Sequence, residues 1–193
     1  SDIRKVVSPV LRTGVDSMVY YIDFSFDKLK LGGSAFAQSL DKIGKEVPTV
    51  QDSEYFANAF NAVQELINKE LILAGHDISA GGMITTMLEM NFANTEGGLE
   101  VSLDEIPEKD LVKILFSENP GILIQVEKTD EVEKILKKAG VAFIRLARPC
   151  DERHLLIHKD GADYQFFIDH LRDIWFESSY LLDRKQSGEK ASK

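Results

Sequence analysis

The stretch His76-Asp77-Ile78-Ser79-Ala80-Gly81-Gly82 separates two apolar segments with different periodicities. Just before it, residues 71–74 form an unbroken apolar run of the length expected for a buried strand. After it, apolar residues recur at the spacing of one helical face, which predicts a helix from about Gly82 to Ala93. The stretch is therefore predicted to be the turn between a strand and a helix.

This turn combines a carboxylate, a hydroxyl and two glycines. Free backbone N–H groups and the helix dipole favour an anion such as phosphate at the start of a helix. The Asp77 carboxylate could give one oxygen ligand to Mg²⁺, which usually keeps waters and takes one or two carboxylates together with phosphates. Alternatively, Asp77 or Ser79 only caps the helix. The residues alone leave both interpretations open.

The same stretch resembles a known family. His-Asp-x-Ser-x-Gly-Gly, followed by the helical sequence Leu-Glu-Met-Asn-Phe-Ala at 88–93, is similar to the second AIR-synthetase-related half of formylglycinamidine ribonucleotide synthase. That enzyme makes a purine precursor. Further segments occur in the order of the large single-chain form of the family, and they are Leu31–Gln38, Leu115–Gly121, Ile122–Val126 and Leu171–Ser179. The resemblance covers nearly the whole chain.

The resemblance implies a parent enzyme that uses ATP and glutamine to convert formylglycinamide ribonucleotide into its amidine. It also implies that Asp77 contacts Mg²⁺ and that Ser79 contacts bound ATP or ADP, at a structural site that does not hydrolyse the nucleotide. This chain has Ala80 where the family usually has Asp, so one negative charge is missing there. No catalytic residue is assigned here, and the isolated chain is expected to be inactive.

The resemblance also suggests a domain division. We expect an AIR-synthetase-like C-terminal domain at residues 1–168, and a C-terminal helix and linker at 169–193 leading toward an absent glutaminase domain. Because the chain begins Ser-Asp-Ile rather than with Met, we expect a piece of a longer protein whose remaining domains are its partners. A stand-alone, non-catalytic nucleotide-binding or assembly module is the alternative. Nearer enzymatic rivals are AIR synthetase, selenophosphate synthetase and thiamine-phosphate kinase. The extension from Leu171 to Tyr180 and the Leu-Gly-Gly-Ser start at Leu31 argue against them.

Strands and helices are interleaved along the chain. Strands are predicted at 19–24, 71–74, 99–102, 122–126, 142–147, 154–158 and 164–167. Helices are predicted from Ser34 to Gly44, from Asp52 or Ser53 past Ile67, and at 82–93, 107–116, 130–139 and 169–184. The last three strands are joined too closely for parallel crossovers, with Asp160-Gly161 as a hairpin turn, so the sheet is mixed and largely antiparallel. The fold class is α+β, with helices packed against the sheet as in the AIR-synthetase C-terminal domain.

Two helices are given specific apolar faces. Phe36, Leu40 and Ile43 share a face of the helix that begins at Ser34. The final helix is expected to face a core with the residues Leu171, Ile174, Trp175 and Leu181. Alternatively, its aromatic rings fill a junction with another domain.

Composition excludes several classes of protein. The net charge of −9 argues against a nucleic-acid partner, which would require clustered Lys and Arg. No apolar run approaches the roughly 20 residues that span a bilayer, and the N-terminus has no signal-peptide pattern, so no membrane partner is expected. Cys150 is the only cysteine, which excludes an internal disulfide and suits the reducing cytoplasm.

The remaining chemically active side chains receive structural roles. His76, at the end of a strand, is expected to be packed rather than to act as a base. His154 and His158 are expected on one sheet face, at the surface. Glu118 either faces a partner domain or is a solvated carboxylate at a helix end. Gly32-Gly33-Ser34 is expected to be a close-packed corner rather than a phosphate-binding turn.

Overall fold

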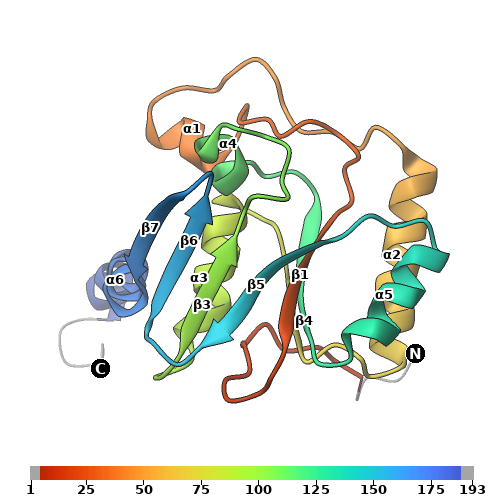
Figure 1. The fold of residues 1–193 in the computed structure, drawn as a ribbon. Coiled ribbons are helices and arrows are strands. Elements are labelled where there is room, and N and C mark those ends of the chain that lie inside the picture. Colours follow the sequence, from red (N-terminus) through yellow and green to blue (C-terminus); the bar gives the residue numbers. More distant parts are fainter. Residues whose placement is uncertain (1–4, 188–193) are drawn as a thin grey trace.

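The computed structural model describes residues 5–187, in which seven strands form one sheet in the order β2-β4-β1-β5-β3-β6-β7 (Figure 1). The strands are β1 Met18–Asp23, β2 Ala74–Asp77, β3 Gly98–Ser102, β4 Gly121–Val126, β5 Ile144–Cys150, β6 His154–Lys159 and β7 Ala162–Phe167. The helices are α1 Ala35–Ser39, α2 Ser53–Asn68, α3 Gly82–Phe92, α4 Leu111–Phe116, α5 Thr129–Lys138 and α6 Ile168–Ser187. Of the paired strands, β3 and β6 run parallel and the others antiparallel, which confirms the predicted α+β class.

The interior strand β1 is buried on both faces because each face of the sheet has its own hydrophobic core there. Val19 and Tyr21 belong to a core shared with α3 and α4. Tyr20 and Ile22 point the other way, into a core shared with α2 and α5. Alternation along the strand therefore divides its side chains between two helical layers, which Figure 1 shows on either side of β1 and β4.

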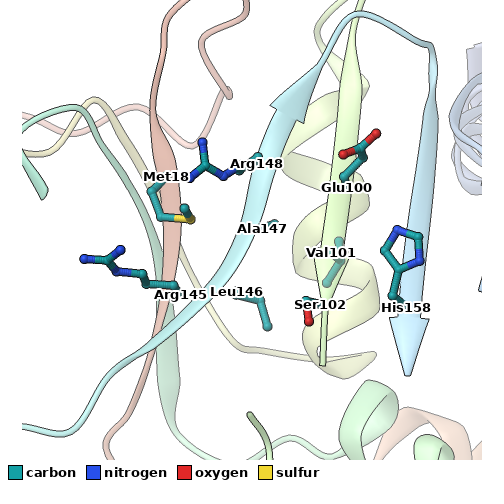
Figure 2. Close-up of a pocket in the computed structure, with 9 residues that line it drawn as sticks. All are labelled: Met18, Glu100, Val101, Ser102, Arg145, Leu146, Ala147, Arg148 and His158. Carbon is teal, nitrogen blue, oxygen red and sulfur yellow. The ribbon is translucent and has the colours of Figure 1, made fainter. Parts of the chain in front are cut away.

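Within residues 5–187, part of one sheet face has no helix over it. On β3, β5 and β6 the side chains of Glu100, Arg148 and His158 share a face opposite the α3 core, around a shallow hollow of about 210 Å³ (Figure 2). His158 Nδ1 lies 2.6 Å from Asp163 Oδ1 of β7. His154 and His158 lie on this face, as expected from their spacing, but both are half-buried rather than exposed.

The first predicted helix is much shorter than expected. Ser34 caps it as predicted, accepting a hydrogen bond from the Ala37 N–H at 3.2 Å, but α1 ends at Ser39 rather than at Gly44. The following loop folds back on the glycine turn, with the Gly32 N–H donating to Glu46 O at 2.8 Å. The assignment of Ile43 to an apolar helical face was wrong, since Ile43 is 76% exposed.

Other element boundaries also differ. β2 begins at Ala74 rather than at Leu71, and α4 begins at Leu111 rather than at Pro107, because Asp110 accepts a hydrogen bond from the Val112 N–H at 3.0 Å and caps it. In α2 the aromatic residue Phe60 is 47% exposed. The predicted β-hairpin turn is present, with Asp160 and Gly161 both at positive φ.

The final helix was predicted correctly in place but wrongly in orientation. Leu171 is half-buried, whereas Ile174, Trp175 and Leu181 are each about half exposed. Trp175 does contact Phe92 of α3, with ring centroids 5.7 Å apart. α6 therefore packs on α3 along one edge and leaves most of its apolar residues on the surface, while the proposed domain division at 168/169 stays a prediction.

Candidate functional site

The candidate residues lie where the edge strand β2 meets α3. Asp77 is the last residue of β2, paired with Ile122 of β4. The Ile78 N–H donates to Gly121 O at 2.8 Å, and the Ile78 side chain is buried. Asp77 and Ser79, on either side of Ile78, are exposed. Ile78 therefore anchors the turn while its two neighbours face outward.

Neither Asp77 nor Ser79 caps α3, so this alternative was wrong. The N-cap residue is Gly81, at φ 89°, and its place requires a conformation that glycine adopts readily. Ser79 contributes only its backbone carbonyl, which accepts a hydrogen bond from the Gly82 N–H at 3.0 Å. The Asp77 side chain is 76% exposed, and His76 Nδ1 lies 3.5 Å from its Oδ1. Both polar side chains are accessible to a ligand.

The carboxylate that does hold the start of α3 comes from Glu118, between α4 and β4. Glu118 Oε1 accepts hydrogen bonds from the Gly81 N–H at 2.8 Å and from the Ala35 N–H at 2.8 Å. The Glu118 side chain is half-buried and hydrogen-bonded to residues of this chain, so it is not the solvated helix-end carboxylate that was one of the two expectations. Since one amide of the turn is already occupied by Glu118, the expectation that the N–H groups here are free for phosphate needs correction.

The residues beside Glu118 hold another segment. Asn119 is buried, and its Nδ2 donates to Ser25 Oγ at 3.0 Å and to Lys28 O at 3.1 Å. Its Oδ1 accepts a hydrogen bond from the Lys30 N–H at 3.3 Å. The corner between α4 and β4 thus binds both the segment that leads into α1 and the turn that leads into α3. The Gly32-Gly33-Ser34 turn is the close-packed corner that was expected, because a Cβ on Gly32 would lie 2.2 Å from Glu46 O.

His76 is held from two sides. Its Nδ1 is 2.9 Å from Asp77 O, and its Nε2 is 3.3 Å from Glu89 Oε2 of α3. The side chain is 20% exposed. These contacts agree with a packed histidine that links β2 to α3, rather than a free base.

Two adjoining hollows flank His76. One, of about 340 Å³, includes Asp77, and the other, of about 300 Å³, includes Trp175 of α6. Both are lined by Pro9 and His76. The surface beside the Asp77 carboxylate is therefore concave and continues toward aromatic side chains.

The ligand set for a metal is incomplete in the described part of the chain. Within residues 5–187 no group of three or more His, Cys, Asp or Glu side chains could hold a metal ion. Asp77 alone fits a Mg²⁺ site of the kind completed by phosphates and waters, since that ion takes only one or two carboxylates. An exposed carboxylate beside an exposed hydroxyl is consistent with such a shared site.

A family model described as "AIR synthase related protein, C-terminal domain" matches residues 18–155. The chain belongs to this family. It is 36% identical over 190 residues to the probable phosphoribosylformylglycinamidine synthase, chloroplastic/mitochondrial, of Arabidopsis thaliana, covering 96% of this chain and 13% of that protein. The phosphoribosylformylglycinamidine synthase of Homo sapiens is 31% identical over 193 residues, with 96% of this chain and 14% of that protein covered.

Solved structures agree on the fold. T. maritima PurL complexed with ATP matches with a TM-score of 0.66 at 15% identity, over 88% of this chain and 28% of that chain. The complex of the same protein with FGAR matches with a TM-score of 0.65 at 18% identity, over 88% of this chain and 30% of that chain. The sequence matches make this AIR-synthase-related chain homologous to one region of the longer phosphoribosylformylglycinamidine synthases.

Two further findings concern extent and location. The chain spans only 13 to 15% of the length of the curated synthases it matches. No helix within residues 5–187 is long and apolar enough to cross a membrane. Because one relative is named as chloroplastic/mitochondrial, membership of the family does not fix the compartment.

Proposed function

We propose that this chain is the C-terminal AIR-synthase-like domain of the second half of a phosphoribosylformylglycinamidine synthase, in which it forms part of a nucleotide and Mg²⁺ site. The main support is the outward-facing pair Asp77 and Ser79, on a turn anchored by the buried Ile78. The similarity to whole synthases over 96% of the chain supports the parent enzyme. Structures of T. maritima PurL complexed with ATP and with ADP support a nucleotide as the ligand class.

In this proposal Asp77 gives one carboxylate oxygen to Mg²⁺ and the Ser79 hydroxyl donates to a phosphate oxygen. Bound Mg²⁺ would offset the negative charge of the phosphates. His76, held by Glu89, keeps the end of β2 in place beside α3. The Ala80 side chain adds no charge, so Asp77 is the only carboxylate among residues 77–82.

The parent reaction would convert formylglycinamide ribonucleotide to its amidine, with ATP and glutamine-derived ammonia. ATP phosphorylates the amide oxygen, and ammonia then displaces the phosphate. We assign no catalytic residue to this chain, because its nucleotide site is proposed to be structural. The isolated chain is expected to form no amidine, and detectable amidine formation by it would refute this assignment. A cytoplasmic location is part of the same proposal.

Calorimetric titration of ADP with Mg²⁺ into this chain tests the site, with Asp77→Ala as the variant. Asp163→Ala is a matched control, because Asp163 is an exposed carboxylate at the far edge of the sheet, on β7. The proposal expects binding by the original chain and by Asp163→Ala, but not by Asp77→Ala. Equal binding by all three proteins would remove Asp77 from the site.

The encoding reading frame tests the parent enzyme independently. A frame that continues into a glutaminase domain supports the synthase. A frame that ends soon after residue 193 would instead favour a stand-alone nucleotide-binding or assembly module.

A further inference from the structure

One oxygen of Glu118 joins two turns that are distant in the sequence. Glu118 Oε1 accepts hydrogen bonds from the N–H of Gly81, 37 residues away, and from the N–H of Ala35, 83 residues away. Both N···O distances are 2.8 Å. Hydrogen bonds from backbone N–H groups to a carboxylate are stronger than those to a neutral acceptor. The Glu118 side chain thus connects the first residue of α1 to the N-cap of α3 by two strong bonds.

The backbone under Glu118 is itself fixed. Its neighbours Ser117 and Asn119 are buried, at 3% and 1% exposure, and Asn119 binds the segment that precedes α1. The Phe36 ring of α1 stacks on Phe116 of α4, with centroids 4.7 Å apart. The carboxylate therefore projects from a rigid corner and sets the positions of the two turns relative to it.

The start of α3 also touches this corner directly. Gly82 lies so close to α4 that a Cβ there would be 2.6 Å from Leu115 O. The residues that face outward, Asp77 and Ser79, are only a few positions before this contact. Any displacement of Gly81 and Gly82 from the corner would therefore also move Asp77 and Ser79.

We propose that Glu118 is a positioning residue, which couples the Asp77 turn to the Gly32-Gly33-Ser34 turn and holds Asp77 and Ser79 in their ligand-binding arrangement. Its carboxylate also occupies the amide that a phosphate would otherwise use at the start of α3. The nucleotide phosphates are therefore held in front of the turn, by the Ser79 hydroxyl and by Mg²⁺ bound to Asp77, and not by the Gly81 amide. The coupling stands on the two hydrogen bonds alone, whereas the ligand-binding part rests on the proposed function.

Amide hydrogen exchange followed by NMR tests the coupling without any ligand. In Glu118→Ala the Gly81 and Ala35 amides are expected to exchange about tenfold faster or more, as for the loss of a bond to a charged acceptor. Glu118→Gln keeps an acceptor oxygen at the same length and is expected to restore part of the protection. Glu108→Ala is the matched control, because Glu108 also accepts from two backbone amides, but only from its neighbours at 109 and 110. Unchanged exchange in Glu118→Ala, or a change at only one of the two amides, would overturn the coupling.

Titration of ADP with Mg²⁺ into the same variants tests the positioning role. Glu118→Ala is expected to bind ADP with Mg²⁺ about tenfold more weakly than the original chain does. The affinity of Glu118→Gln should lie between these two, and Glu108→Ala should bind with the affinity of the original chain. In the original chain ADP with Mg²⁺ should also slow exchange at the Ala35 amide, and this effect should vanish in Glu118→Ala. Equal affinity of the original chain and Glu118→Ala would overturn the positioning role and leave the proposed function intact. Absence of binding to every protein, with both amides still released in Glu118→Ala, would count against the ligand-binding part and leave the coupling established.

Discussion

Substitution of Gly82 by alanine tests how closely the Asp77 turn is built against α4. Gly82 has φ 73°, and an added Cβ would lie 2.6 Å from Leu115 O and 2.8 Å from Phe116 Cα. Gly140 has nearly the same φ, 68°, but a Cβ there meets no atom within 4 Å. The two substitutions therefore share the cost of a left-handed backbone, about 1–2 kcal/mol, and differ in the clash.

The clash adds to the cost only at Gly82. Forcing extra atoms into a packed position typically costs about 1–3 kcal/mol. Moving the start of α3 also strains the bond from the Gly81 N–H to Glu118, and loss of a bond to a charged group costs about 1.5–3 kcal/mol. Together the two costs predict that Gly82→Ala lowers the free energy of unfolding by about 2.5–6 kcal/mol more than Gly140→Ala does.

Urea unfolding followed by circular dichroism measures this difference, with the slope m as a check on the denatured state. The comparison is valid if m is the same for both variants. Equal destabilisation by Gly82→Ala and Gly140→Ala would show that α3 does not approach α4 as described at Gly82, and would leave the two hydrogen bonds of Glu118 as the sole support for its coupling role.

Other predictions concern buried polar groups. The Lys137 ammonium, followed by the Tyr20 hydroxyl, lowers the pKa of Glu133 to about 2 from 4.5. A carboxylate whose pKa is lowered in the folded state stabilises the fold at pH values above the unfolded-state pKa, and this stabilisation is lost as the pH falls toward the folded-state pKa. The difference in unfolding free energy between the original chain and Glu133→Gln, measured by urea unfolding, should therefore shrink from pH 7 to pH 3. A constant difference would contradict this. Asn119→Ala removes two donated hydrogen bonds and should cost about 1–3 kcal/mol in the same assay, while a change below 0.5 kcal/mol would contradict the contacts. Gln125→Leu removes the hydrogen bonds of the buried Gln125 amide to the part-buried Arg12 N–H and C=O and to the buried Ser17 Oγ, and should lower the thermal midpoint by several degrees, since a group left unpaired costs about 1–3 kcal/mol; an unchanged midpoint would refute this.

Local signals in the sequence predicted most of the strands and the hairpin turn, but not β2, which was predicted at 71–74 and runs from Ala74 to Asp77. Asp160-Gly161 combines two residues that tolerate positive φ, so the turn type follows from the residues themselves. The same holds for Ser34, whose side chain caps the helix that directly follows it. In each case the determining contact lies within a few residues.

The errors involve contacts between distant residues. The end of α1 depends on the return of Glu46 to Gly32, which no periodicity could reveal. The carboxylate bound at the start of α3 comes from Glu118 rather than from Asp77, although both belong to segments that resemble the family. The predicted orientation of α6 was wrong, because apolar spacing shows that a helix has an apolar face but does not show which surface covers that face.

Retention of Mg²⁺ and nucleotide by the full-length protein tests the central claim most directly. Native mass spectrometry of the purified protein and of its Asp77→Asn variant measures both ligands at once. Because the Asp77 side chain is 76% exposed, the substitution should leave the fold intact. We expect the original protein to retain both ligands and the Asp77→Asn variant to lose both. Unchanged retention of both by the variant would contradict it.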